Sequence, residues 1–201
     1  MNKESTELLY RNIDKNNKPK LLLHACCGPC TSGVFEQLYP YFNITILYYN
    51  PNTYPFDEYI LRYKQLEILK NYLDFDMIFM DYNEKEFYDE IQGLELEKEG
   101  GKRCEVCYRI RMNKTAEIAS QKGFDYFTTT LSVSPYKNAQ KLNEIGDEME
   151  KKYNIKYIYS DFKKNEGYKN SIKNSKEYGL YRQDYCGCEY SLRDRKNINK
   201  E

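Results

Sequence analysis

Five short apolar runs alternate along the chain with stretches of helical periodicity, and this alternation restricts the fold more than any other feature. The runs are rich in aliphatic, aromatic and β-branched residues and cover 21–25, 43–49, 76–81, 124–130 and 155–160. Helices are predicted from near Pro29, over 56–73, within 83–99, over about 104–121, from Ser134-Pro135 to Tyr153, and over about 167–179. Strands that alternate with helices favour a parallel sheet covered on both faces. The sequence therefore predicts an α/β fold with one five-stranded parallel sheet flanked by helices.

The length of 201 residues corresponds to about one domain. We expect residues 1–19 to form an N-terminal arm or short helix, 20–191 a single α/β catalytic domain, and 192–201 a C-terminal tail without regular structure. The chain has neither the apolar segment of a leader peptide nor an apolar run long enough to span a membrane. A cytoplasmic location without a membrane partner is expected.

Three predicted turns follow directly after strands, at 26–30, 50–55 and 131–136. The carboxyl ends of parallel strands meet at one edge of a sheet, and ligands bind in the crevice outside that edge. We therefore expect the three turns to face one crevice.

Seven cysteines fall into three groups: Cys26, Cys27 and Cys30, then Cys104 and Cys107, then Cys186 and Cys188. Inside a cell, clusters of this kind are more typical of metal ligands or redox thiols than of structural disulfides. Seven cysteines exceed the two of a dithiol enzyme and the four of a zinc site, and they suit an iron–sulfur cluster with further thiolates. The alternative is a structural zinc site made by the second and third groups, with the first group left for redox work. For His24, the only histidine, we expect a core position and a position beside the metal equally.

The chain carries 31 basic and 31 acidic residues, so no overall positive field indicates a nucleic-acid partner. Charge is nevertheless segregated along the chain. Ten acidic residues lie between Asp74 and Glu99, basic residues are concentrated between Lys98 and Lys114, and five lysines lie between Lys163 and Lys176. For these five lysines we prefer an exposed, solvated helix face to a binding role.

Five ordered segments resemble the signatures of the QueH-type epoxyqueuosine reductases: LLHACCGPC (22–30), YNPNTYP (49–55), GGKRCEVCYRIR (100–111), FTTTLSVSPYKN (127–138) and GLYRQDYCGCEYS (179–191). The resemblance implies reduction of epoxyqueuosine to queuosine at the wobble position of tRNA anticodons, the last step of queuosine biosynthesis. It implies a fold similar to the adenine-nucleotide α-hydrolase-like (HUP-like) proteins. It also implies a 4Fe-4S cluster beside a second mononuclear metal, expected to be iron, with the seven cysteines as ligands.

The spacing of the cysteines leaves their partition between the two centres open. Deoxygenation of an epoxide requires two electrons and two protons, so we expect an external electron donor and a proton donor near the substrate. Candidate catalytic acids are Asp184, Tyr185 and Tyr136, and candidates that hold the ribose or base are Asn50 and Ser134. Candidate phosphate-binding cations near the cysteines are Lys102, Arg103, Arg109, Arg111 and Arg182. The alternative function is a zinc-stabilised tRNA-binding or sulfur-transfer protein with a dithiol redox motif.

Overall fold

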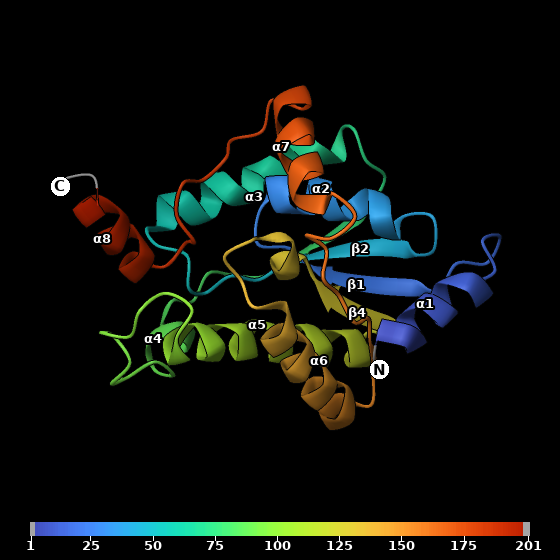
Figure 1. Cartoon of the computed structure of the whole chain (residues 1–201), viewed down its shortest axis with the longest axis horizontal. Coiled ribbons are helices and arrows are strands. Elements are labelled where there is room, and N and C mark those ends of the chain that lie inside the picture. The colour runs from blue at the N-terminus through green and yellow to red at the C-terminus, as the bar shows by residue number, and fades with distance from the viewer. Residues whose placement is uncertain (1–2, 199–201) are drawn as a thin grey trace.

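A computed structural model describes residues 3–198, and its centre is one all-parallel sheet (Figure 1). The strands are β1 (Lys20–His24), β2 (Asn43–Tyr48), β3 (Asp76–Phe79), β4 (Tyr126–Thr129) and β5 (Lys156–Tyr157). They lie in the order β3-β2-β1-β4-β5. The predicted α/β fold with a five-stranded parallel sheet is confirmed. The sheet is consistent with the expected likeness to HUP-like proteins, which stays a prediction.

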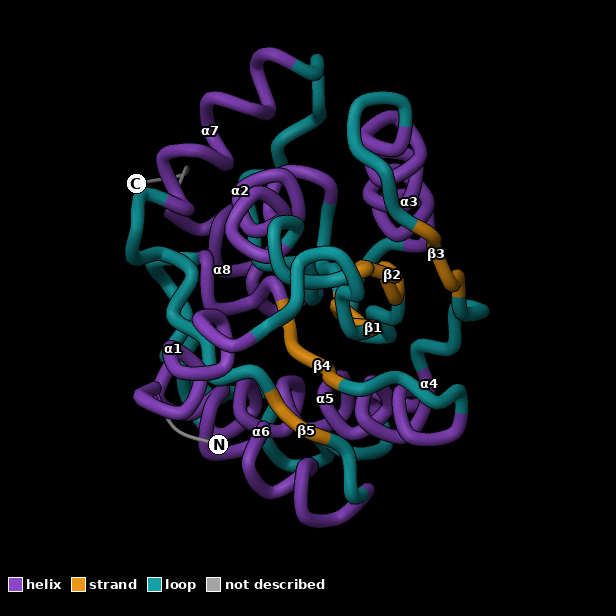
Figure 2. The backbone as a smooth tube through the Cα atoms, turned by 90° about the vertical axis from the view of Figure 1, so that its right-hand side faces the viewer, coloured by secondary structure: helices purple, strands orange, loops and turns teal. Residues whose placement is uncertain are grey.

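Helices cover both faces of this sheet (Figure 1 and Figure 2). On one face lie α2 (Gly28–Leu38), α3 (Phe56–Lys70) and α7 (Gly167–Glu177), and on the other lie α5 (Lys102–Gln121) and α6 (Ala139–Tyr153). The remaining elements are α1 (Lys3–Asn12), α4 (Lys85–Tyr88), the 3₁₀ helix η1 (Thr130–Val133) and α8 (Glu189–Ile198). Figure 1 shows α4 and α8 beyond the carboxyl ends of the strands. No helix within residues 3–198 is both long and apolar enough to span a membrane.

The central strand β1 is buried on both faces because its side chains alternate between two hydrophobic cores. Leu21 and Leu23 pack in the core that includes α2 and α3, whereas Leu22 packs in the core that includes α5 and α6. All three leucines are fully buried. Burial of each such side chain contributes about 1.5–3 kcal/mol, so the apolar run at 21–25 is placed in the middle of the sheet.

Helix α6 begins later than predicted. Ser134 precedes a proline and is extended (ψ 131°), which is the conformation that a following proline favours. The helix begins only at Ala139, where the side chain of Asn138 accepts a hydrogen bond from the Lys141 amide at 3.1 Å. The prediction of a helix from Ser134-Pro135 is therefore wrong at its start, because η1 and an asparagine cap define this segment.

The segment 83–99 consists mostly of turns, with only the short helix α4 within it. The guanidinium of Arg103 donates to the carbonyl oxygens of Leu94 and Glu95, at 3.4 and 2.9 Å, and to that of Glu97 at 2.5 Å. These carbonyl groups are thus satisfied by a side chain instead of by helical amides. The helix expected within 83–99 is α4, and these contacts fix the turns that connect it to α5.

Two further differences concern the C-terminal part of the chain. The expected strand at 155–160 contributes only Lys156–Tyr157 to the ladder, because the Asn143 side chain forms two 2.9 Å hydrogen bonds with the backbone of Ser160. The expected irregular tail instead contains helix α8, which ends at residue 198.

At the other end of the chain, α1 is held against the protein. Leu9 and Tyr10 pack against the core of α2 and α3, and the Tyr10 ring stacks on Tyr41 with the ring centroids 4.7 Å apart. Residues 1–2 of the expected arm and 199–201 of the expected tail lie outside the described residues.

The chain leaves β1 and β4, which are neighbours in the sheet, toward opposite faces. The connection after β1 leads to α2 on one face, and the connection after β4 leads through η1 to α6 on the other. Such a divergence opens a crevice at the carboxyl ends of the two strands. The Asn50 amide donates to the Ala25 carbonyl oxygen at 2.9 Å, and the Cys26 amide donates to the Thr130 hydroxyl at 3.3 Å. The turns after β1, β2 and β4 therefore meet, as predicted.

Candidate metal centre and cavity

The first cysteine group is folded around the N-terminus of α2. Cys27 caps this helix, and its sulfur accepts a hydrogen bond from the Cys30 amide at 3.3 Å. The sulfur atoms of Cys26, Cys27 and Cys30 all lie within 4.8 Å of one another. A turn after a buried strand thus gathers three soft ligands in a space that suits one metal ion.

These three thiols differ in pKa. Hydrogen bonds from the Cys27 and Cys30 thiols lower the pKa of Cys26 well below its usual range. Burial raises the pKa of Cys27 to about 12, and hydrogen bonding to the Cys26 and Cys27 sulfurs raises the pKa of Cys30. One thiolate therefore forms readily, and a bound cation is needed to deprotonate all three.

The second and third cysteine groups form one neighbourhood. Cys104 and Cys107 lie in the first turns of α5, and Cys186 and Cys188 lie in the segment before α8. Cys107 and Cys188 pack in the same small hydrophobic cluster. Burial raises the pKa of Cys107 to about 12, and the charges of the other three cysteines add to this effect. The fold therefore brings four thiols from two distant segments together.

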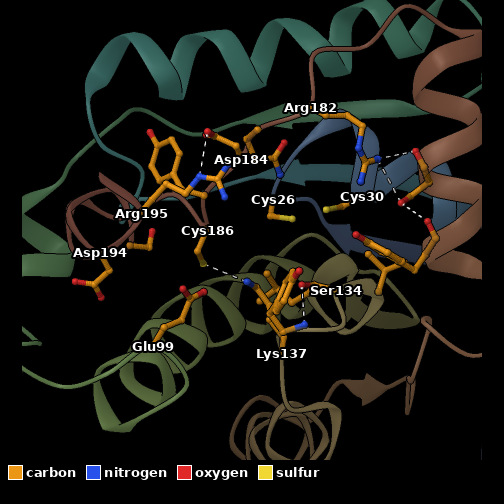
Figure 3. Close-up of a pocket in the computed structure, with 18 of the residues that line it drawn as sticks. Cys26, Cys30, Glu99, Ser134, Lys137, Arg182, Asp184, Cys186, Asp194 and Arg195 are labelled. Carbon is orange, nitrogen blue, oxygen red and sulfur yellow. Dashed lines mark hydrogen bonds and ion pairs between the residues drawn. The ribbon is translucent and has the colours of Figure 1, made fainter. Parts of the chain in front are cut away.

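A cavity of about 380 Å³ adjoins both sets of cysteines (Figure 3). Cys26 and Cys30 line it from the turn after β1, and Cys186 lines it from the segment before α8. Lys137 also lines the cavity, and its Nζ donates a hydrogen bond to the Cys186 sulfur at 3.1 Å, drawn as a dashed line in Figure 3. The volume falls within the range of small-molecule sites in proteins.

The segment that carries Cys186 is fixed by a buried arginine of α3. Arg62 forms a 2.7 Å ion pair with Glu58 and donates to the carbonyl oxygens of Cys186 at 2.9 Å and Tyr185 at 3.3 Å. Gly187 has φ +137°, and a Cβ at this position would lie 2.9 Å from the Arg62 Nη1. The turn between the last two cysteines thus needs a glycine for both its backbone conformation and its contact with Arg62.

Residues 21–194 match the family described as epoxyqueuosine reductase QueH. The chain belongs to the QueH family. It is 41% identical over 182 residues to the epoxyqueuosine reductase QueH of Streptococcus pyogenes serotype M1, with 88% of this chain and 71% of the relative covered. The protein of the same name from Staphylococcus epidermidis is 40% identical over 198 residues (92% and 82% covered), and that from Thermotoga maritima is 33% identical over 184 residues (90% and 94% covered). The family resemblance expected from the five motifs is confirmed.

Six of the site residues predicted for this QueH family member, besides the cysteines, line the cavity: Ser134, Tyr136, Arg182, Asp184, Tyr185 and Arg111. Tyr136 is 77% exposed, and its amide donates to the Ser134 hydroxyl at 3.3 Å. Asp184 forms a 3.4 Å ion pair with Arg195. The Tyr185 hydroxyl donates to the Tyr54 carbonyl oxygen, and burial raises the pKa of Tyr185.

Four other predicted residues are not part of the cavity lining. Asn50 is 2% exposed, and its side-chain amide donates a hydrogen bond to the Ala25 carbonyl oxygen. Arg103 is buried and donates to carbonyl groups in the 83–99 segment, so it is not accessible to a phosphate. Lys102 is exposed, and Arg109 is partly exposed and forms an ion pair with Glu148 that joins α5 to α6. Asn50 and Arg103 therefore hold backbone in place.

The five lysines between 163 and 176 lie in α7 and in the turn before it. Lys169 forms a 2.6 Å ion pair with Glu166, and the Lys163 Nζ donates to the Lys137 carbonyl oxygen at 3.1 Å. Lys169, Lys173 and Lys176 are exposed on α7, as expected for a solvated helix face, and Lys164 is exposed in the turn before it.

His24 is a satisfied core histidine. Its Nε2 donates to the Tyr49 carbonyl oxygen at 3.0 Å, which leaves Nδ1 to accept from the Thr129 hydroxyl at 2.9 Å. Burial lowers the pKa of His24 to about 4. Both ring nitrogens are engaged in tying β1 to its two neighbouring strands, so the structure favours the core role over the metal-adjacent one.

Three residues that contact the cysteine segments were not predicted from the sequence. Lys137 contacts the Cys186 sulfur, the Gln183 amide donates to the Cys27 sulfur at 3.0 Å, and Arg62 holds the Cys186 carbonyl group. Lys137 and Gln183 lie inside the motif segments 127–138 and 179–191. Their place in these motifs could have identified them as site residues. Arg62 lies in a helix without a motif, and no local pattern identifies it.

Proposed function

We propose that this chain reduces the epoxide of epoxyqueuosine in tRNA to the cyclopentene of queuosine. The observation that carries the proposal is the convergence, in a QueH family chain, of thiols from two separate segments on one cavity, with Cys107 of a third segment packed beside Cys188. Two electrons from an external donor and two protons are consumed, and water is released. The cytoplasm, where tRNA is found, is the compartment that we expect for this activity.

The donor set fits two metal centres. All seven cysteines are free thiols, and Lys137 supplies a positive charge beside Cys186. We assign Cys104, Cys107, Cys186 and Cys188 to a 4Fe-4S cluster, which takes four thiolates, and Cys26, Cys27 and Cys30 to a second metal, iron. When bound, the cluster would supply electrons one at a time, and an iron held by Cys26, Cys27 and Cys30 would supply a Lewis acid.

The residues of the chain then bind and orient the substrate. Tyr136 is a highly exposed aromatic residue of the cavity lining, which suits a surface on which an anticodon base stacks. The exposed Arg182 is our candidate for a phosphate contact, and Ser134 is our candidate for a contact to the base or ribose. Asp184 and Tyr185 are the candidate proton donors, since both line the cavity.

The test is anaerobic purification followed by iron, sulfide and zinc analysis and an assay with epoxyqueuosine-tRNA and a one-electron reductant. We expect a coloured protein with about five iron atoms per chain, and tRNA nucleosides in which queuosine replaces epoxyqueuosine. A colourless, reconstituted protein that contains one zinc and no iron contradicts the proposal and favours a structural zinc site.

Two single substitutions test the assignment of the ligands. Cys107→Ser should remove the visible absorption of the cluster, whereas Cys27→Ser should keep it and lose the second iron. Arg109→Gln is the matched control, because Arg109 lies on the same helix as Cys107 and is half exposed. Loss of the cluster in Cys27→Ser, with retention in Cys107→Ser, contradicts the assignment.

A further inference from the structure

Three arginines are buried within the described part of the chain, and two of them are held by structural contacts. Arg62 is 1% exposed and pairs with the Glu58 carboxylate besides its two carbonyl contacts. Arg103 is 1% exposed, donates to three carbonyl groups and stacks on Tyr190. The Arg103 Nε has no partner in the described chain, but Arg103 does not line the cavity. In both cases the protein itself offsets most of the loss of hydration of the guanidinium.

The third arginine has fewer such partners, although its guanidinium lies over the Tyr108 ring, 5.9 Å from the ring centroid. Arg111 is 3% exposed, and its Nε donates to the Cys107 carbonyl oxygen at 3.1 Å. Its Nη2 is buried and has no hydrogen-bond partner among the described residues. A buried charged group with a free donor is costly unless a ligand completes its hydrogen bonds.

The position of Arg111 indicates where that ligand lies. Arg111 follows Cys107 by one turn of α5 and lines the cavity together with Cys26 and Cys186. Lys137, another cation beside these cysteines, has its Nζ directed at the Cys186 sulfur. Arg111 therefore brings a side chain with an unpartnered donor to the lining of the cavity that adjoins both sets of cysteines.

We propose that Arg111 binds the epoxide oxygen of the substrate through its Nη2. The inference rests on the proposed function and extends it to a residue that touches the reacting atom. Because Arg111 is almost fully buried, we assign it to the reacting end of the substrate and not to a tRNA phosphate, which would approach the cavity from outside.

The proposed contact is consistent with the balance of the reaction. Two carbon–oxygen bonds break, one carbon–carbon double bond forms, and two electrons arrive from the external one-electron donor. The oxygen takes up two protons and leaves as water, so negative charge develops on it before protonation. A guanidinium remains protonated and donates hydrogen bonds to that oxygen without transferring a proton.

The test compares binding of two tRNAs by the metal-loaded, oxidised protein without reductant. Epoxyqueuosine-tRNA carries the oxygen, and queuosine-tRNA lacks it. For Arg111→Gln we expect the Kd of epoxyqueuosine-tRNA to rise on the order of tenfold to a hundredfold, with the Kd of queuosine-tRNA unchanged. Lys114→Gln, on the same helix and paired with Glu117, should change neither Kd.

Three results overturn the assignment. An equal loss of affinity for both tRNAs means that Arg111 acts in general tRNA binding. Unchanged affinity for both tRNAs means that it does not touch the epoxide, and a shifted reduction potential then identifies it as a counter-charge for the metal centre. If Arg111→Gln loses iron, Arg111→Lys takes its place and should show the same selective loss, because an ammonium lacks the fork of donors. Loss of iron in both variants shows a structural role.

An activity assay of the unsubstituted protein tests the proposed function separately. That protein must convert epoxyqueuosine-tRNA when the reductant is supplied. If it does not convert this tRNA, the proposed function fails. If it does, and Arg111→Gln binds both tRNAs normally, only the assignment of Arg111 fails.

Discussion

Replacement of Arg62 by methionine tests the connection between α3 and the last cysteine segment. The side chain of Arg62 is 2% exposed and that of Glu58 is 9% exposed, so Arg62→Met leaves a nearly buried carboxylate without its ion pair. It also removes the donors to the Cys186 and Tyr185 carbonyl groups. Breaking a buried pair by removal of one partner costs about 3–5 kcal/mol.

The Tyr181 hydroxyl still donates to Glu58 at 3.2 Å in this variant, so we expect the lower end of that range, about 3 kcal/mol. The free energy of unfolding is measured by urea titration of the metal-free, reduced protein. Tyrosine fluorescence serves as the signal, since the chain has 22 tyrosines and no tryptophan. The exposed Lys64 on the same helix supplies the control, and Lys64→Met should change the free energy of unfolding by less than about 0.5 kcal/mol.

The double variant Glu58→Gln/Arg62→Met separates the charge effect from the loss of packing. With the carboxylate neutralised, no unpaired charge remains at this buried position, and the double variant should be more stable than Arg62→Met alone. A loss below about 1 kcal/mol in Arg62→Met, or a double variant that is less stable than the single one, contradicts this account.

Three further predictions concern the core, a titrating ion pair and the cavity mouth. A Cβ at Gly146 would overlap the ring of the fully buried Tyr157, so Gly146→Ala should lower the free energy of unfolding by about 1–3 kcal/mol, and an unchanged urea midpoint would argue against such an overlap. Hydrogen bonding to Arg109 lowers the pKa of the Glu148 carboxyl, so the small stabilisation by this exposed pair is present above the ordinary carboxyl pKa and lost as pH falls through the lowered one. Arg109→Gln should therefore raise the pKa of Glu148 in a carboxyl NMR titration, and an unchanged pKa would exclude the pair in solution. Tyr136→Ala should weaken tRNA binding by about 1–3 kcal/mol, whereas Tyr136→Phe should bind normally, and a weakened phenylalanine variant would speak against stacking.

Local sequence patterns were sufficient for most of the sheet and for the longer helices. The run at 21–25 is apolar on both faces, which only a central strand of a covered sheet accommodates, and β1 lies there. The helix expected over about 104–121 is α5. These elements are encoded within windows of neighbouring residues, because period and burial repeat along the chain itself.

The errors fall where distant residues override local preference. The strand expected at 155–160 is shortened by Asn143, whose side chain forms hydrogen bonds with the Ser160 backbone. In α3 the apolar Phe56 is 52% exposed, whereas the polar Arg62 and Gln65 are buried. Both polar residues are covered by the segment around 181–187, to which they are hydrogen-bonded.

Residue order alone was enough to establish a parallel α/β sheet, three groups of cysteines and a resemblance to the QueH family. It left open that Cys104 and Cys107 share a neighbourhood with Cys186 and Cys188, while Cys26 and its two neighbours form a separate set. It also left open that Arg111 lines the cavity and has a buried donor without a partner among the described residues. Spacing along a chain restricts contacts within one element, whereas these contacts depend on how segments far apart in the chain pack together at the carboxyl edge of the sheet.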